Sequence, residues 1–187
     1  MKFIEHIKQS GHLSSDEEKE FLKHVQSRIY KKGEFLFKKG DYCRKIYIVE
    51  SGLARLYYFS EQGKEVTVWL SVDNYYVTAV DSFMKEMPTR NYCEALEDSI
   101  VYEVSQDSFE QLINTSHALA KFSFRTLFDL TTQLINNIDS LKFQTAKERY
   151  VRLQNQQPSI FQKVPLQYIA SYLGITPETL SRLRAEK

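Results

Sequence analysis

The pattern of apolar and polar positions changes period twice along the chain. Residues 2–28 place apolar side chains at helical spacing. Ser14 or Ser15 stands before a run of acidic residues, which is the arrangement of a helix N-cap and first turn. From Tyr30 to about Val104 the period shifts toward two, and beyond this region it is helical again. The pattern therefore predicts helix, then a sheet-rich region, then helix.

The sheet-rich region consists of short runs of β-branched and aromatic residues. These runs are EFLFKKG, KIYIVESG, LARLYYFSEQG, EVTVWL and SIVYEV, and Gly33, Gly40, Gly52 and Gly63 separate them. The stretch FSEQGKEVTV has the pattern of a hairpin, with Gly63 providing the positive φ of its turn. Many short strands joined by tight turns predict a small antiparallel β-barrel or β-roll.

The helical region begins with a short helix that Ser105 can cap. The following stretch, SHALAKFSFRTLFDLTTQLINNIDSLKFQTAKERYVRLQ, contains no Gly or Pro, and Pro158 ends the helical pattern. Apolar residues step along it by 3, 4, 4 and 3, as in a coiled-coil seam: Leu127, Leu130, Leu134, Ile138 and Leu141. Such a stripe fits a helix that faces its own core or a dimer interface. The polar residues that flank it favour the dimer interface.

Residues 166–183 have the residue types of a helix-turn-helix at its spacing. Five positions are apolar: Ile169, Leu173, Ile175, Leu180 and Leu183. Ala170 lets the second helix cross closely over the first, and Gly174 can take the left-handed conformation that ends the first. A plain helical hairpin also tolerates glycine and proline in its loop. The combined match favours a DNA-binding motif.

The second helix of this motif has a well-defined start. Thr176 can be its N-cap, Pro177 suits the first helical position, and Glu178 lies near the positive end of the helix dipole. The outward-facing residues are Pro177, Glu178, Thr179, Ser181, Arg182 and Lys187. Arginine pairs well with guanine, glutamate accepts from cytosine, and hydroxyls bind phosphates. This surface therefore predicts contact with double-stranded DNA.

Composition and charge agree with a nucleic-acid partner. Apolar residues make up 42% of the chain and charged residues 26%, as in ordinary globular proteins. From Lys142 onward there are eight basic and three acidic residues, whereas the preceding part has 17 basic and 21 acidic residues. The N-terminus has no apolar signal-peptide core, and no apolar run reaches the ~18 residues of a membrane span. We expect a cytoplasmic protein with no membrane partner.

The spacing of the cysteines and histidines gives little support to metal or thiol chemistry. Cys43 and Cys93 lie fifty residues apart, so they form no CxxC pair, and we expect both thiols to be reduced and structural. The four histidines, His6, His12, His24 and His117, show no metal-ligand spacing. The sheet-rich region contains none, which argues against a cupin-type enzyme. We expect no metal, no cofactor and no catalysis.

The stretch KKGEFLFKKGDYCRKIYIVESGLARLYYFSEQGKEVTVWLSVDN resembles the cyclic-nucleotide-binding β-roll of the Crp/Fnr transcription regulators, in its Lys-Gly, Gly-Asp, Ser-Gly and Gly-Lys-Glu turns. The apolar seam is similar to that family's dimerisation helix, and LQYIASYLGITPETLSRLR resembles its helix-turn-helix. The resemblance covers roughly residues 10–187. It implies an α+β fold: an antiparallel, jelly-roll-like sensor domain at 1–115, a dimerisation helix at 116–142 and a helix-turn-helix domain at 143–187.

The resemblance also assigns roles on the second helix of the motif. Glu178, Thr179 and Arg182 are the expected base readers, while Thr176, Ser181 and Arg184 are expected to contact phosphates or support the helix. The family binds near-palindromic sites as a two-fold dimer, with each recognition helix in a major groove. Many members add a β-hairpin wing after this helix. No wing is evident here, so we expect its backbone contacts to be weak or absent.

The candidate effector pocket departs from the family pattern. Cyclic-nucleotide-binding members carry Gly-Glu, then an Arg followed by Ser or Thr before an Ala-rich strand. Counted back from Ala95, these positions hold Thr78-Ala79 and Thr89-Arg90, so the ribose-binding Glu is missing and the Arg is displaced by one residue. Such a displacement turns a strand side chain to the opposite face, so we expect Arg90 to point away from the pocket. Tight cyclic AMP binding is not expected, whereas another anionic or apolar effector stays open.

The sequence thus predicts a homodimeric, sequence-specific DNA-binding transcription regulator. RNA polymerase and an unidentified small-molecule effector are further candidate partners. The alternative is a small-molecule or nucleotide-binding β-roll module whose terminal hairpin only packs. DNA binding at two salt concentrations separates the two, because the affinity of a regulator falls steeply as salt rises.

Overall fold

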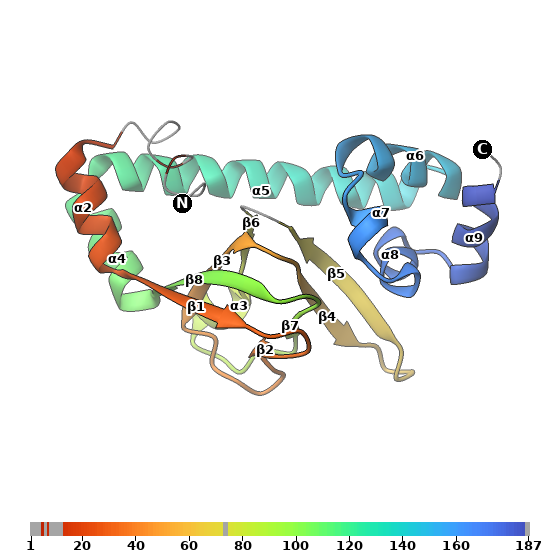
Figure 1. The fold of residues 1–187 in the computed structure, drawn as a ribbon, viewed down its shortest axis with the longest axis horizontal. Coiled ribbons are helices and arrows are strands. Elements are labelled where there is room, and N and C mark those ends of the chain that lie inside the picture. Colours follow the sequence, from red (N-terminus) through yellow and green to blue (C-terminus); the bar gives the residue numbers. More distant parts are fainter. Residues whose placement is uncertain (1–4, 6, 8–12, 73–74, 186–187) are drawn as a thin grey trace.

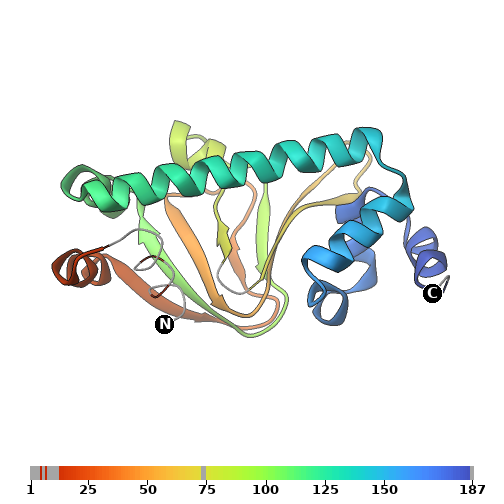
Figure 2. The ribbon, with the colours of Figure 1, turned by 90° about the horizontal axis from the view of Figure 1, so that it is seen from above.

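The computed structural model describes residues 5, 7, 13–72 and 75–185 of the chain. Two antiparallel sheets face each other in a β-roll, and one long helix runs along the roll to a group of terminal helices (Figure 1, Figure 2). The first sheet has the order β1 (Val25–Tyr30), β8 (Ser99–Ser105), β3 (Lys45–Ser51), β6 (Tyr75–Val77). The second has the order β2 (Phe35–Phe37), β7 (Tyr92–Ala95), β4 (Ala54–Phe59), β5 (Glu65–Ser71).

The helices lie before, within and after the roll. They are α2 (Ser15–Lys23), α3 (Val80–Lys85), α4 (Gln106–Thr115), α5 (His117–Phe143), α6 (Ala146–Gln156), α7 (Ile160–Lys163), α8 (Leu166–Leu173) and α9 (Pro177–Ala185). This arrangement confirms the expected α+β class, with a roll, a long helix and a terminal helical group. Among the helices of the described ranges, none is both long and apolar enough to cross a bilayer.

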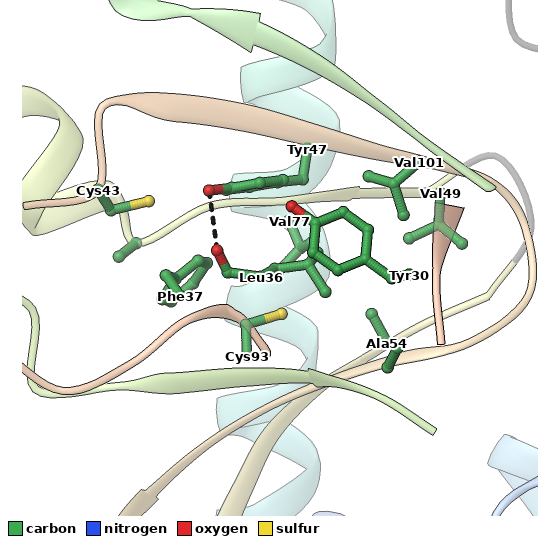
Figure 3. Close-up of a cluster of buried hydrophobic side chains, with 12 residues drawn as sticks. Tyr30, Leu36, Phe37, Cys43, Tyr47, Val49, Ala54, Val77, Cys93 and Val101 are labelled. Carbon is green, nitrogen blue, oxygen red and sulfur yellow. Dashed lines mark hydrogen bonds between the residues drawn. The ribbon is translucent and has the colours of Figure 1, made fainter. Parts of the chain in front are cut away.

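The core of the roll is made by side chains from both sheets, which point toward one another (Figure 3). The Tyr47 hydroxyl on β3 donates to the backbone oxygen of Leu36 on β2 at 3.0 Å, so one hydrogen bond joins the two sheets. Cys43 and Cys93 are both reduced and buried here. Burial raises the pKa of the Cys93 thiol, which makes it a poor nucleophile.

The local signals for turns and caps are confirmed. Gly63 has a φ of 75° in the β4–β5 hairpin. Ser14 caps α2 in a reciprocal capping box with Glu17, and the Ser105 hydroxyl caps α4. These features depend on neighbours in the sequence, which is why the sequence reveals them.

Two expectations about helices are wrong. Residues 25–28 belong to β1 rather than to the first helix, because they pair in register with β8 from Val25 opposite Val104 onward. The residues before 13 lie mostly outside the described part of the chain. The long helical stretch is also divided after Phe143. Thr145 and Glu148 form a second capping box there, which starts α6 as a separate helix.

Candidate nucleic-acid interface

The turn between α8 and α9 has the geometry that the sequence predicts for a helix-turn-helix. Gly174 adopts φ 65° and ψ 36°, the left-handed conformation that ends α8. The Ile175 N–H donates to the Ala170 carbonyl at 3.0 Å, and the Gly174 N–H donates to the Ser171 carbonyl at 3.1 Å. These bonds satisfy carbonyls at the end of α8 and turn the chain sharply into α9.

The start of α9 is fixed by a side-chain cap. The Thr176 hydroxyl accepts from the Thr179 N–H at 3.2 Å, and Pro177 is the first helical residue. A hydrogen bond from its own backbone N–H lowers the pKa of the Glu178 carboxyl, with further lowering by the Thr176 hydroxyl and the Arg182 charge. Glu178 therefore stays ionised at neutral pH and can accept from a base amino group.

One face of α9 is buried and the other is exposed. Leu180 is fully buried in the cluster that it shares with Ile169, Ala170 and Leu173 of α8, and Leu183 packs at its edge. The exposed residues are Thr176, Pro177, Glu178, Ser181, Arg182 and Arg184, while Thr179 is half-buried. The helix lies at one end of the molecule, away from the roll (Figure 1). All seven candidate DNA-contacting residues therefore lie on or next to one accessible helix.

Arg182 is the exposed cation closest to the start of α9. Its Nη2 donates to the Thr179 hydroxyl at 3.4 Å, a long hydrogen bond. Within the described ranges Arg182 and Arg184 form no salt bridge. Both charges are available to an anionic partner.

The five candidate dimer residues form an apolar stripe on α5. Leu127, Leu134, Ile138 and Leu141 are between 47% and 59% exposed, and Leu130 is half-buried. Phe124 and Phe128 add exposed rings at the same end of the stripe, with centroids 4.7 Å apart. A continuous exposed apolar stripe of this kind is uncommon on a single chain in water and marks an interaction surface.

A cavity of about 600 Å³ lies where the roll meets the helices. Strand β5 supplies Val66 and Trp69, α5 supplies Gln133 and Asn137, and α6 supplies Arg152 among its walls. The Trp69 Nε1 and the Arg152 Nε are buried there without a hydrogen-bond partner among the described residues. Both atoms are covered by protein, so neither donor is open to the cavity.

The four candidate effector residues do not all reach this cavity. Arg90 lines it, and also lines a neighbouring cavity of about 450 Å³ together with Lys39 and Tyr58. The Arg90 side chain is exposed, with the guanidinium 5.1 Å from the centroid of the Tyr58 ring, and its orientation relative to the family's cyclic-nucleotide pocket stays a prediction. Thr78, Ala79 and Thr89 line neither cavity. The Thr78 hydroxyl instead donates to the Lys45 carbonyl, while Ala79 and Thr89 are buried.

The β-roll is the part of the chain that matches a known domain family. Residues 27–116 match the cyclic nucleotide-binding domain family. The chain is 27% identical over 119 residues to a cAMP-dependent protein kinase regulatory subunit of Debaryomyces hansenii, a match that covers 64% of this chain and 25% of that protein. It is 30% identical over 164 residues to the fumarate and nitrate reduction regulatory protein of Vibrio cholerae, covering 81% of this chain and 64% of the relative. The chain thus spans less than two thirds of either relative.

Solved structures extend the likeness beyond the roll. FixK2 from Bradyrhizobium japonicum superposes with a TM-score of 0.75 at 19% identity, covering 87% of this chain and 83% of that one. A Crp/Fnr family regulator from Eubacterium rectale gives a TM-score of 0.70 at 19% identity, covering 94% and 83%. Both coverages are larger than residues 1–143 alone supply, so the shared fold includes terminal helices. The chain is therefore similar in fold to the Crp/Fnr regulators.

The similarity to Crp/Fnr regulators makes the terminal helices the informative part of this chain. The roll is shared with a kinase regulatory subunit, so a roll by itself does not identify what the protein acts on. The surfaces that can distinguish a DNA-binding regulator from a β-roll module without DNA binding are the exposed face of α9 and the stripe on α5.

The sequence did not indicate the place of one buried polar group, the Arg55 guanidinium. Arg55 is buried at the junction of the roll and α8, with only 1% of its surface exposed. The available signal was a single charged residue in the apolar run LARLYYF. Its partner helix is distant in the sequence, so the sequence alone could not show what it contacts.

Proposed function

We propose that this protein is a sequence-specific DNA-binding transcription regulator that acts as a homodimer in the cytoplasm. The observation that carries the proposal is the exposed, capped α9, whose outward face carries Glu178, Ser181, Arg182 and Arg184 with both arginines free of salt bridges to described residues. Base-reading and phosphate-binding groups of this kind are what a helix in a major groove needs.

The proposed division of labour follows the expected boundaries. Residues 1–115 form the sensor or scaffold, 116–142 the dimerisation helix and 143–187 the DNA-binding domain. Glu178, Thr179 and Arg182 would read bases, and Thr176, Ser181 and Arg184 would contact phosphates or support the helix. Pairing of the α5 stripes would set two recognition helices on a near-palindromic operator. RNA polymerase is a candidate partner on the DNA, and no catalysis is assigned.

In the proposed mechanism a small-molecule effector controls the regulator. The cavity of about 600 Å³ adjoins β5, α5 and α6, so a ligand there would contact roll, dimerisation helix and DNA-binding domain together. Differential binding of such a ligand to two arrangements would shift their populations. The cavity walls include the Gln133 and Asn137 amides and the exposed Arg90, which favour an anionic or carbonyl-bearing molecule. This same observation favours the alternative function, a β-roll that binds a small molecule without binding DNA.

The experiment that tests the proposal uses genomic DNA. Fragments retained by the purified chain are recovered, and binding of the recovered duplexes is measured at two salt concentrations by fluorescence anisotropy. A regulator should retain discrete fragments, and its affinity should fall steeply as salt rises. A chain that retains no fragment, or whose affinity does not respond to salt, would support the small-molecule module instead.

A further inference from the structure

Arg55 is the centre of a polar cluster on β4. Its side chain lies on the face of the sheet that is turned away from the roll interior, directly opposite Glu94 of β7 in the strand register. The Nη1 atom donates to the Glu65 carboxylate at 2.7 Å and to the Glu94 carboxylate at 3.2 Å. The Nε atom donates to the Thr67 hydroxyl at 3.0 Å. Three strands therefore fix the plane of one guanidinium.

The terminal domain covers this cluster. The Tyr168 ring on α8 lies 3.6 Å from the Arg55 Cζ, and the Tyr57 ring on β4 lies 4.1 Å from it. The guanidinium is therefore in contact with rings from the roll and from the terminal domain. Its Nη2 has no hydrogen-bond partner among the described residues and is buried. Cation–π contact is strongest when the cation is desolvated, as it is here.

Other contacts join the same two surfaces. The Thr67 N–H donates to the Ser171 hydroxyl at 2.9 Å, and that hydroxyl donates to the Glu65 carbonyl at 3.1 Å. Leu53 and Leu70 of the roll belong to one apolar cluster with the core of the terminal helices. At the rim, Lys163 lies 3.0 Å from Glu97 with both side chains about one third exposed. α8 is thereby seated on the roll by polar and apolar contacts together.

We propose that Arg55 is a positioning residue that fixes the DNA-binding domain on the roll, and so sets the direction in which the recognition helix α9 is presented. The inference rests on the proposed function. α8 and α9 share a core through Leu180, so an orientation imposed on α8 through Tyr168 passes to α9. In a dimer this fixes the separation of two recognition helices, and hence the spacing of the half-sites that the dimer accepts.

The experiment compares variants of the full chain. Tyr168→Leu removes the stacking ring and leaves the Arg55 ion pairs intact, whereas Arg55→Met removes the guanidinium. Lys163→Gln is the matched control, because it breaks an exposed ion pair at the same interface without touching the cluster. The probes are the recovered operator, the same operator with one base pair added to or removed from its centre, and a duplex with a single half-site.

Two readouts separate docking from DNA binding. Hydrogen exchange of the Thr67 amide, in the absence of DNA, reports whether the Ser171 hydroxyl still accepts a hydrogen bond from that amide. Spacing preference is the ratio of the affinity for the recovered operator to that for the altered ones. Tyr168→Leu should speed exchange at Thr67 and reduce the spacing preference by about fivefold or more. Single half-site affinity should stay within about twofold of that of the wild type, and Lys163→Gln should behave as the wild type.

The possible results of these measurements bear on the positioning role of Arg55 in different ways. Faster exchange with unchanged spacing preference would show that Arg55 seats the domain but does not position α9 on DNA, which overturns the proposal. If Tyr168→Leu and Arg55→Met both left hydrogen exchange at the Thr67 amide unchanged, Arg55 would not hold α8 on the roll, and the proposal would be overturned. If the wild type binds no DNA, the proposed function fails and the positioning role fails with it, while exchange at Thr67 still shows whether Arg55 holds α8. Arg55→Met leaves the Glu65 and Glu94 carboxylates without a cation. If Arg55→Met does not fold for this reason, the results for Tyr168→Leu test the proposal by themselves.

Discussion

Arg182 is the side chain on α9 best placed to distinguish bases. It is exposed, one helical turn from the Glu178 carboxylate, and among the described residues its guanidinium has one long hydrogen bond. A bidentate contact from arginine to a guanine edge discriminates by about 1–3 kcal/mol. Arg184, also exposed and free of salt bridges to described residues, is the natural comparison on the same helix.

We expect Arg182→Ala to weaken binding to the recovered operator by about 1–3 kcal/mol and to relax base preference at one position. Arg184→Ala should weaken binding to all sequences by a similar factor, as loss of a phosphate contact does. Competition binding on single-base operator variants measures both. If Arg182→Ala weakened operator and random DNA equally, Arg182 would be a phosphate contact only.

Gly174 carries two separate constraints. Its φ of 65° is unfavourable for any L side chain, and an added Cβ would lie 3.1 Å from the Leu141 Cδ2. Gly63 has a comparable φ of 75° and open space around the Cβ position. Replacing each glycine by alanine therefore separates two costs: backbone strain, which is present at both positions, and the Leu141 contact, which is present only at Gly174.

Gly63→Ala should cost about 1–2 kcal/mol of unfolding free energy, because it carries the left-handed strain alone. Gly174→Ala should cost more, since Leu141 must also move. Urea denaturation of both variants gives the comparison. Equal losses would mean that the Leu141 side chain adjusts freely, and that the α5 stripe does not constrain the turn.

At the scale of the element, the stripe on α5 is the feature with the clearest consequence. Leu134→Asp puts a charge in the middle of the apolar stripe, and burying that charge between two helices is costly. We expect this variant to sediment as a monomer where the wild type sediments as a dimer. Thr132→Asp introduces the same charge on the opposite, exposed side of the helix and should leave the dimer intact. A Leu134→Asp chain that stays dimeric would locate the interface elsewhere.

The junction of α2 and α5 gives a dependence on pH. The Ser116 hydroxyl, which caps α5, donates to the Glu17 carboxylate, and this bond is the main cause that lowers the pKa of Glu17. Since the folded pKa is the lower one, the stabilisation is present above the ordinary glutamate pKa. It is lost as the pH falls through the folded value.

We expect the urea midpoint of the wild type to fall between about pH 7 and about pH 3 by more than that of Glu17→Gln, in which this group cannot titrate. Glu61→Gln changes an exposed carboxylate at the hairpin tip and should reproduce the wild-type difference. Identical pH responses of wild type and Glu17→Gln would show that the Ser116 bond contributes nothing measurable to folding.

At the scale of the molecule, we expect the roll not to bind cyclic nucleotides tightly. The positions of the ribose-binding Gly-Glu pair hold Thr78, whose hydroxyl is bonded to the Lys45 carbonyl, and Ala79, which is buried. Calorimetry with cyclic AMP and cyclic GMP at micromolar concentration should therefore show no binding heat. Binding at that concentration would mean that Arg90, which lines the cavity, supplies enough phosphate contact by itself.

What the sequence could predict depends on how local each feature is. The caps at Ser14, Ser105 and Thr176 and the left-handed glycines are decided by nearby residues, so they could be read directly. Strands β6 and β7 are only three and four residues long, and they form because distant partners pair with them. The same holds for the candidate site. The exposed face of α9 follows from the spacing of its leucines, whereas the contact of Arg55 with Tyr168 joins residues that no local pattern connects.

The two hydrogen bonds of Ser171 have a consequence for solubility. β5 is the outermost strand of its sheet, and the amide of Thr67 and the carbonyl of Glu65 would otherwise be open to a strand from another molecule. The terminal domain therefore also shields an aggregation-prone edge. A fragment cut after the long helix should expose that edge and self-associate through it, so proteolysis of this chain should yield a roll that precipitates more readily than the intact protein.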